Sequence, residues 1–139
     1  MPKPQPRYRF AVIATDVALF TVRDGQLHIL LMKMQKHPYQ KAWAIPGGLV
    51  QSKESVDQAA RRNLLIKAGA KDIFLEQLYT FGRVDRDPFG RVVSVAYYAL
   101  VASTALALEK TNYQVAWWPI SKLPPLAFPP LLAILRCFS

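Results

Sequence analysis

The chain has 139 residues, of which 52% are hydrophobic and 19% charged, and this balance excludes a disordered protein and favours one folded domain. No apolar run in the sequence is long enough to span a bilayer, and the single cysteine, Cys137, excludes an internal disulfide, so we expect a cytoplasmic protein. The net charge of +9 is spread along the chain without a basic block, and it suits a small phosphorylated ligand at least as well as a polynucleotide.

The N-terminal third predicts an arm followed by a β-hairpin. Residues 1–9 carry three prolines and three basic residues, which indicates an extended arm ahead of the fold. From Phe10 the sequence is apolar and β-branched and predicts a strand that is interrupted at Asp16. Asp24 and Gly25 favour a tight hairpin turn, so the run LHILLMKM that follows is the expected second strand.

A glycine turn, a loop and a helix are predicted over residues 47–70, which read GGLVQSKESVDQAARRNLLIKAGA. Ser55 and Gln58 have the spacing of a capping box, in which each residue satisfies a backbone N–H of the other. We therefore expect the helix to begin at Val56. It should end where Gly69 takes the left-handed conformation.

The second half of the chain predicts strands and a final helix. Two strand-like segments, over 73–81 and 92–102, are joined by a polar loop over 82–91. A short strand near 115–118, a proline-rich crossing and an apolar helix from about Pro129 complete the chain. The alternation of strand and helix regions predicts an α/β or α+β domain.

The polar loop is a candidate anion clamp. Guanidinium groups bind diphosphates and carboxylates through two parallel hydrogen bonds, and this loop is rich in arginine. The alternative is a charged hairpin tip whose arginines pair with its own aspartates, and the residues alone favour this alternative. The charged residues are Arg83, Asp85, Arg86, Asp87 and Arg91.

The stretch 47–70 resembles the Nudix box of the Nudix hydrolase family. That motif has a glycine, a glutamate six positions on, and an arginine eight positions later. A glutamate, an aliphatic residue, two further glutamates, a glycine and an aliphatic residue follow at fixed places. The residues in register are Gly48, Glu54, Arg62, Leu64, Gly69 and Ala70, the last being small for its position. The places of the three glutamates hold Asn63, Ile66 and Lys67.

The resemblance implies that those three positions bind the magnesium ions that bridge a pyrophosphate and activate water in the family. Magnesium requires hard oxygen ligands, whereas Ile66 offers none, Asn63 offers a neutral one and Lys67 brings a positive charge. Lys67 either is solvated near the helix C-terminus, where the macrodipole favours cations, or faces a ligand phosphate; the residues leave both open. Glu54 and Arg62 are implied to form a salt bridge that maintains the shape of the box.

The similarity extends to one branch of the family, the ADP-ribose pyrophosphatase-like proteins and the Nudix-related transcriptional regulators. It is carried by the runs LEQLYTFGRVDRDPFGRVVSVAYYALV, AWAIPGG and WWPISKLPPLAF. It implies a Nudix-type α/β/α sandwich with a mixed sheet, formed by residues 10–139 as a single Nudix domain after the arm. The resemblance strengthens the anion-clamp interpretation of the polar loop, in which Arg86 and Asp87 match the branch. Phe89 departs from the branch, in which arginine is common at this position.

The sequence and the resemblance leave three functions open. The first is a domain that binds ADP-ribose or a related nucleoside diphosphate compound without a cofactor, with hydrolysis weak or lost. Its ligand-binding residues would be Lys67, Arg83, Arg86, Asp87 and Arg91. The second is an active magnesium-dependent hydrolase of such compounds, in which Glu76 is a speculative metal ligand or base. The third is a protein-interaction module with an empty cleft.

The expected partners follow from the same comparison. In the regulators a winged-helix DNA-binding domain follows the Nudix domain, whereas this sequence ends at Ser139. We therefore do not expect a nucleic acid partner by that route. A homodimer is compatible with the sequence, and no membrane partner is expected.

Overall fold

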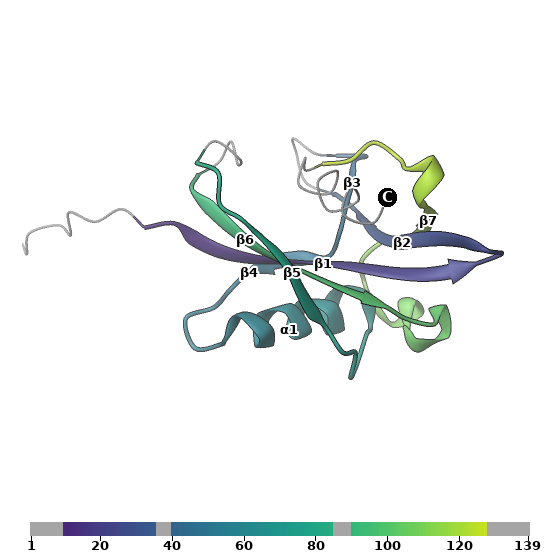
Figure 1. Cartoon of the computed structure of the whole chain (residues 1–139), viewed down its shortest axis with the longest axis horizontal. Coiled ribbons are helices and arrows are strands. Elements are labelled where there is room, and N and C mark those ends of the chain that lie inside the picture. Colours follow the sequence, from purple (N-terminus) through teal and green to yellow (C-terminus); the bar gives the residue numbers. More distant parts are fainter. Residues whose placement is uncertain (1–9, 36–39, 85–89, 128–139) are drawn as a thin grey trace, which may run out of the picture.

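The computed structural model describes residues 10–35, 40–84 and 90–127 (Figure 1). Within these residues the chain is an α/β domain with one mixed sheet. The elements are β1 (Val12–Arg23), β2 (Gln26–Lys33), β3 (Trp43–Ala44), β4 (Gly47–Leu49), α1 (Val56–Ala68), β5 (Glu76–Phe81), β6 (Val92–Leu100) and β7 (Val115–Pro119), with three short 3-10 turns at Ser103–Ala105, Leu108–Lys110 and Ile120–Lys122. The second helical layer expected from Pro129 and the arm over 1–9 fall outside the described residues.

The sheet is organised around β1. The strand order is β3-β2-β1-β6-β5, with β1 and β6 parallel and the other pairs antiparallel, as expected for a mixed sheet. The edge of β1 opposite β6 is shared by two strands: β4 pairs with its first half, through Ala14 to Asp16, and β2 pairs with its second half, from Phe20 onward. Between these pairings Val17 N–H donates to the Pro46 carbonyl at 2.9 Å.

The hairpin between β1 and β2 confirms the predicted turn. Asp24 and Gly25 have φ values of 52° and 72°, so both occupy the left-handed region that a two-residue type I′ turn requires. The register that follows pairs Arg23 with Gln26 and Phe20 with Ile29. This register places alternate apolar side chains of the two strands on the same face of the sheet.

Hydrophobic clusters cover both faces of the sheet. Helix α1 packs on one face, where it lies along the sheet in Figure 1. The buried residues of that face are Val17, Leu19, Leu30, Ala60, Leu64, Ala68, Ala70, Ile73, Tyr97, Ala99 and Leu106. The cluster on the other face contains Ala18, Phe20, Ile29, Leu31, Ile45 and Ala96. The alternation of odd and even positions along β1 between the two clusters is what a strand buried on both sides requires.

Both ends of α1 are as predicted. Ser55 Oγ accepts from Gln58 N–H at 3.1 Å, and the Gln58 side chain accepts from Ser55 N–H at 2.8 Å, which completes the capping box. Gly69 ends the helix with φ 62°. A Cβ at this glycine would also overlap the Ala107 carbonyl, so both backbone conformation and space demand glycine here.

The predicted interruption of the first strand at Asp16 is wrong. β1 continues through this residue without a break, because the Asp16 carboxylate accepts a hydrogen bond from Ser94 Oγ on the neighbouring strand β6. The polar side chain is therefore accommodated within the sheet. The segment predicted as a strand from Ile73 forms ladder pairs only from Glu76 onward.

A buried tyrosine attaches α1 to the sheet. Tyr97 on β6 is 2% exposed, and its hydroxyl donates to the Asp57 carboxylate in the first turn of α1. Gln77 Nε2 donates to the same hydroxyl at 3.3 Å. Burial, followed by the hydrogen bond to Asp57, raises the pKa of Tyr97 to about 12, so the hydroxyl remains a donor at physiological pH.

Replacement of this hydroxyl should loosen the helix. We expect Tyr97→Phe to lower the free energy of unfolding by about 1.5 kcal/mol, which is a typical loss for a hydrogen bond to a charged group. Tyr98→Phe is the matched control, because Tyr98 donates to the exposed Glu76 carboxylate instead. Denaturant unfolding of both variants measures the difference, and equal losses would contradict an anchoring role of Tyr97.

Candidate functional site

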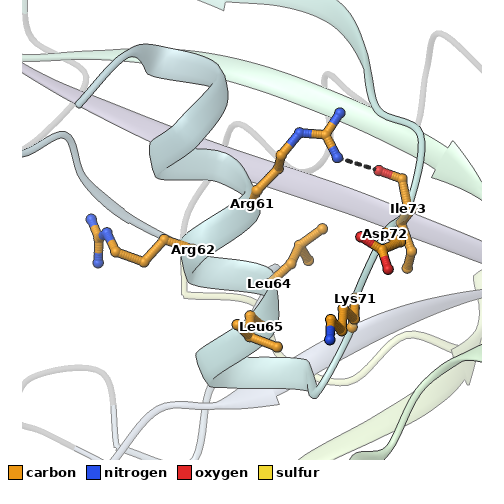
Figure 2. A pocket seen from close by; sticks show the side chains of 8 residues that line it. Arg61, Arg62, Leu64, Leu65, Lys71, Asp72 and Ile73 are labelled. Atoms are coloured by element: carbon orange, nitrogen blue, oxygen red, sulfur yellow. Dashed lines mark hydrogen bonds between the residues drawn. The ribbon is translucent and has the colours of Figure 1, made fainter.

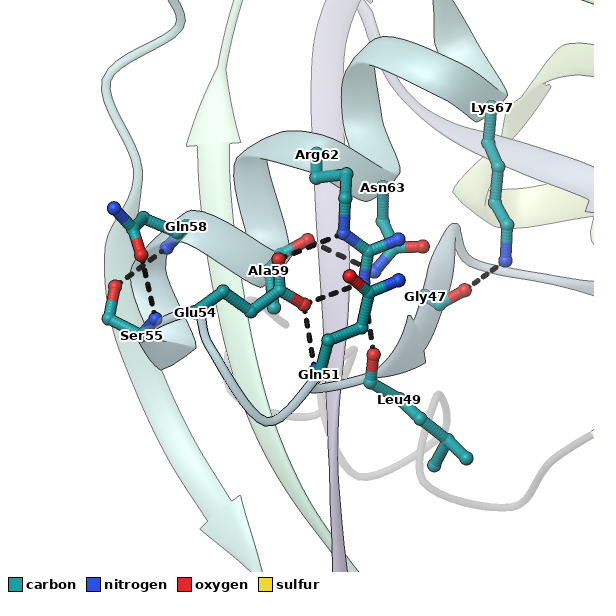
Figure 3. Close-up of polar contacts among 10 residues, drawn as sticks. All are labelled: Gly47, Leu49, Gln51, Glu54, Ser55, Gln58, Ala59, Arg62, Asn63 and Lys67. Atoms are coloured by element: carbon teal, nitrogen blue, oxygen red, sulfur yellow. Dashed lines mark hydrogen bonds and ion pairs between the residues drawn. The ribbon is translucent and has the colours of Figure 1, made fainter.

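The loop between β4 and α1 is fastened to the helix by the predicted salt bridge (Figure 3). Arg62 on α1 donates to both carboxylate oxygens of Glu54, at 2.9 and 2.7 Å. The same guanidinium donates to the Leu49 carbonyl at 3.1 Å, and Gln51 N–H donates to Glu54 at 2.9 Å. One bidentate pair therefore ties the end of β4, the loop and the helix together.

The charges of this pair stabilise each other. The hydrogen bond from Arg62 is the largest cause that lowers the pKa of Glu54, and the hydrogen bond to Glu54 raises the pKa of Arg62. The Glu54 side chain is 12% exposed and that of Arg62 is 31% exposed. The pair is thus partly shielded from water, and its role in the fold is to hold the box in shape.

Strand β4 is tightly packed at two glycines, at Gly48 against α1 and at Gly47 against β1. Asn63 is buried, and its Nδ2 donates to the Ala59 carbonyl one turn earlier at 3.0 Å. Its Oδ1 lies against Gly48, where an added Cβ would come within 2.6 Å. At Gly47 an added Cβ would overlap the Asp16 carboxylate, which faces it across the β1–β4 ladder. Neither position has room for a side chain.

Lys67 points toward the sheet instead of into solvent. Its ammonium donates to the Gly47 carbonyl, and Figure 3 shows the side chain extending from the last turn of α1 to β4. It also lies 5.8 Å from the centre of the Tyr113 ring, within cation–π range. Burial is the main cause that lowers the pKa of Lys67, while the nearby Asp16 carboxylate raises it. The interpretation of Lys67 as a solvated helix charge is therefore wrong.

Sequence reasoning missed Asp16 as a member of this site. Asp16 lies opposite Gly47 on β1, its carboxylate is bonded to Ser94, and its charge acts on Lys67. The available signal was a carboxylate inside an otherwise apolar, β-branched strand. A charged residue in such a place requires a partner.

The residues present do not fit a magnesium site. Of the three positions that the resemblance assigns to metal-binding glutamates, Ile66 is half exposed and has no donor atom, Asn63 is bonded to the helix backbone, and Lys67 presents a cation to the Gly47 carbonyl. In residues 10–35, 40–84 and 90–127 no group of three His, Cys, Asp or Glu side chains could hold a metal ion. The donor set lacks the hard anionic oxygens that magnesium prefers.

The polar loop is only partly described. Arg83 is exposed, and Arg91 donates to the carbonyls of Gly82 at 2.7 Å and Arg83 at 3.3 Å, so its guanidinium braces the base of the loop. Arg86 and Asp87 lie outside the described residues, and their role as ligand-binding residues stays a prediction.

Glu76 lies apart from the box. It is the first residue of the edge strand β5, and its carboxylate accepts from the Tyr98 hydroxyl at 2.7 Å. Strands β1 and β6 separate β5 from β4, a distance of about 14 Å at the usual strand spacing. Its assignment as metal ligand or base stays a prediction. Glu76 does line a hollow of about 490 Å³ beside Phe74 and Leu100.

A smaller pocket, of about 290 Å³, lies between α1 and the segment 70–73 that follows it (Figure 2). Arg61 crosses it and donates to the Ile73 carbonyl at 2.7 Å, whereas Arg62 points away toward the loop. Lys71 and Asp72 complete its polar lining. Neither Gly47 nor Lys67 lines this pocket or the hollow near Glu76.

Comparison with known proteins assigns the family. Residues 13–136 match the NUDIX domain. The chain belongs to the Nudix family. Over 113 residues it is 38% identical to the ADPR responsive transcriptional repressor NtrR of Acinetobacter baylyi, a match that covers 80% of this chain and 45% of the repressor. Over 112 residues it is 30% identical to the ADP-ribose pyrophosphatase of Methanocaldococcus jannaschii, covering 81% of this chain and 66% of that enzyme.

Solved Nudix structures agree with this fold. The NUDIX domain of Shewanella oneidensis NrtR complexed with ADP ribose superimposes with a TM-score of 0.83 at 32% identity, over 98% of this chain and 92% of that one. A mutT/nudix family protein from Listeria innocua gives a TM-score of 0.78 at 33% identity, over 94% of both chains. The chain thus spans less than two thirds of the length of the two curated relatives, but nearly all of the NrtR Nudix domain. In the part of the chain that the structure describes, no helix is long and apolar enough to cross a membrane.

Disruption of the Glu54–Arg62 pair tests its role as a brace. We expect Glu54→Gln to lower the melting temperature more than Glu109→Gln, because Glu54 is paired with Arg62 whereas Glu109 is exposed. The pKa of Glu54 is lowered in the folded state, so its contribution is fully present above the ordinary value of 4.5 and is lost as the pH falls through the lower folded-state value. Melting curves of the wild type and Glu54→Gln should therefore converge in acid. A gap that persists unchanged well below pH 4.5 would argue against the ion pair.

Proposed function

We propose that this Nudix domain binds ADP-ribose or a related nucleoside diphosphate compound, and that hydrolysis is weak or lost because the metal-binding glutamates of the box are replaced. The observation that carries the proposal is the contact of the Lys67 ammonium with the Gly47 carbonyl. A carboxylate in that place would attract a metal ion, whereas an ammonium repels one and attracts a phosphate.

The choice of ligand is supported by the relatives. The NrtR Nudix domain that superimposes on this chain is complexed with ADP ribose, and the Acinetobacter repressor is ADPR responsive. The retained shape of the box supports binding without hydrolysis, because Glu54, Arg62 and the helix cap hold the loop through protein contacts alone. The net charge of +9 favours any anionic ligand over a neutral one.

Binding without metal is the first outcome to measure. Isothermal titration calorimetry should detect ADP-ribose binding with the same affinity in magnesium and in excess chelator. We expect Arg86→Ala to weaken it about tenfold or more, the effect of a lost charge-assisted contact, while Arg23→Ala at the remote hairpin leaves it unchanged. The absence of binding to any nucleoside diphosphate compound would overturn the proposal.

An active magnesium-dependent hydrolase is the second candidate, and the 30% identity with an ADP-ribose pyrophosphatase favours it. It predicts magnesium-dependent release of AMP from ADP-ribose, abolished in Glu76→Gln and retained in the exposed control Glu109→Gln. Chromatographic detection of AMP measures the reaction. A lack of turnover across a panel of nucleoside diphosphate compounds by a folded, ligand-binding protein would decide against this candidate.

A further inference from the structure

Two oxygen groups of the protein approach the Lys67 ammonium. One is the Gly47 carbonyl, which accepts a hydrogen bond from it. The other is the Asp16 carboxylate, whose charge acts on Lys67 and whose Oδ1 lies against Gly47, so close that a Cβ there would overlap it. Ser94 donates to the second oxygen of Asp16 and fixes the carboxylate in this orientation.

A carbonyl and a carboxylate oxygen are also the groups that bind hard divalent cations such as Mg²⁺ and Mn²⁺. In this chain, the positive charge beside these two oxygen groups is the ammonium of Lys67, a residue of α1. Beside the Gly47 carbonyl and the Asp16 carboxylate, the group that opposes a metal ion is the Lys67 ammonium.

We propose that the Lys67 ammonium is a built-in cation that fills the place of a metal ion beside the Gly47 carbonyl and the Asp16 carboxylate. Exchange of this one lysine for glutamate then creates a divalent-cation site. Glutamate would remove the competing charge and add a second carboxylate to the two oxygen groups already in place. The role of the ammonium is to join β4 to the last turn of α1, as a metal bridge would.

The direct probe is Mn²⁺, whose free form is measured by electron paramagnetic resonance. We expect the wild type to leave the Mn²⁺ signal unchanged and Lys67→Glu to bind about one ion per chain. The double variant Lys67→Glu/Asp16→Asn should bind at least about tenfold more weakly, because a carboxylate beside the ion is lost. Lys122→Glu, which makes the same charge change at an exposed residue, is the matched control and should behave as the wild type.

Several results would overturn the proposal. Wild-type protein that binds Mn²⁺ as tightly as Lys67→Glu would show that the lysine does not fill the site. A folded Lys67→Glu protein that binds no Mn²⁺, or one whose binding is indifferent to Asp16→Asn, would show that the two oxygen groups do not form a site.

Circular dichroism reports whether Lys67→Glu folds. If it does not fold, a second variant tests the proposal. Lys67→Met removes the ammonium and adds no charge. We expect it to be less stable than the wild type and to regain melting temperature in millimolar Mn²⁺, while Lys122→Met shows neither effect. A folded Lys67→Met protein without a response to Mn²⁺ overturns the proposal. Since the probe is the metal alone, these outcomes are independent of ADP-ribose binding.

Discussion

The structure depends on the way in which one long strand is shared. β1 has twelve residues, and its edge opposite β6 is divided between β4 near its start and β2 near its end. The first pairing places Gly47 opposite Asp16, and the parallel pairing with β6 brings Ser94 to the same carboxylate. The relative positions of Gly47, Asp16 and Ser94 follow from these pairings. Helix α1 packs against β1 and places the side chains of Arg62 and Lys67 next to β4.

The shape of the box and its charge chemistry rest on different contacts. Shape comes from the capping box, the Glu54–Arg62 pair and two glycines that permit close approach. Of the three positions at which the Nudix motif has its remaining glutamates, only Asn63 takes part in these contacts, through its side chain against Gly48. Asn63 can therefore bond to its own helix and Lys67 can contact Gly47 without any change in the loop. The shape of the loop is therefore largely independent of the charges at these three positions.

Local signals in the sequence predicted the elements well. The turn at Asp24 and Gly25 and the limits of α1 depend on φ values and caps that only a few neighbouring residues determine. The role of Asp16 could not be predicted in this way, because its partner Ser94 lies 78 residues away and is brought to it by the parallel ladder. The direction of Lys67 likewise depends on where β4 lies. Resemblance to a family supplied the Glu54–Arg62 pair, which spacing alone would have left among several possible ion pairs.

The divided edge of β1 also separates two parts of the domain, the β1–β2 hairpin and the box. Where β4 ends its pairing and β2 begins, the link is a single hydrogen bond from Val17 N–H to the Pro46 carbonyl. Of the described residues between β2 and β4, those of β3 pair with β2 and not with β1. Insertions or deletions in that connection need not shift the register of either strand. The hairpin and the box can accordingly accept such changes as two independently paired parts of one sheet.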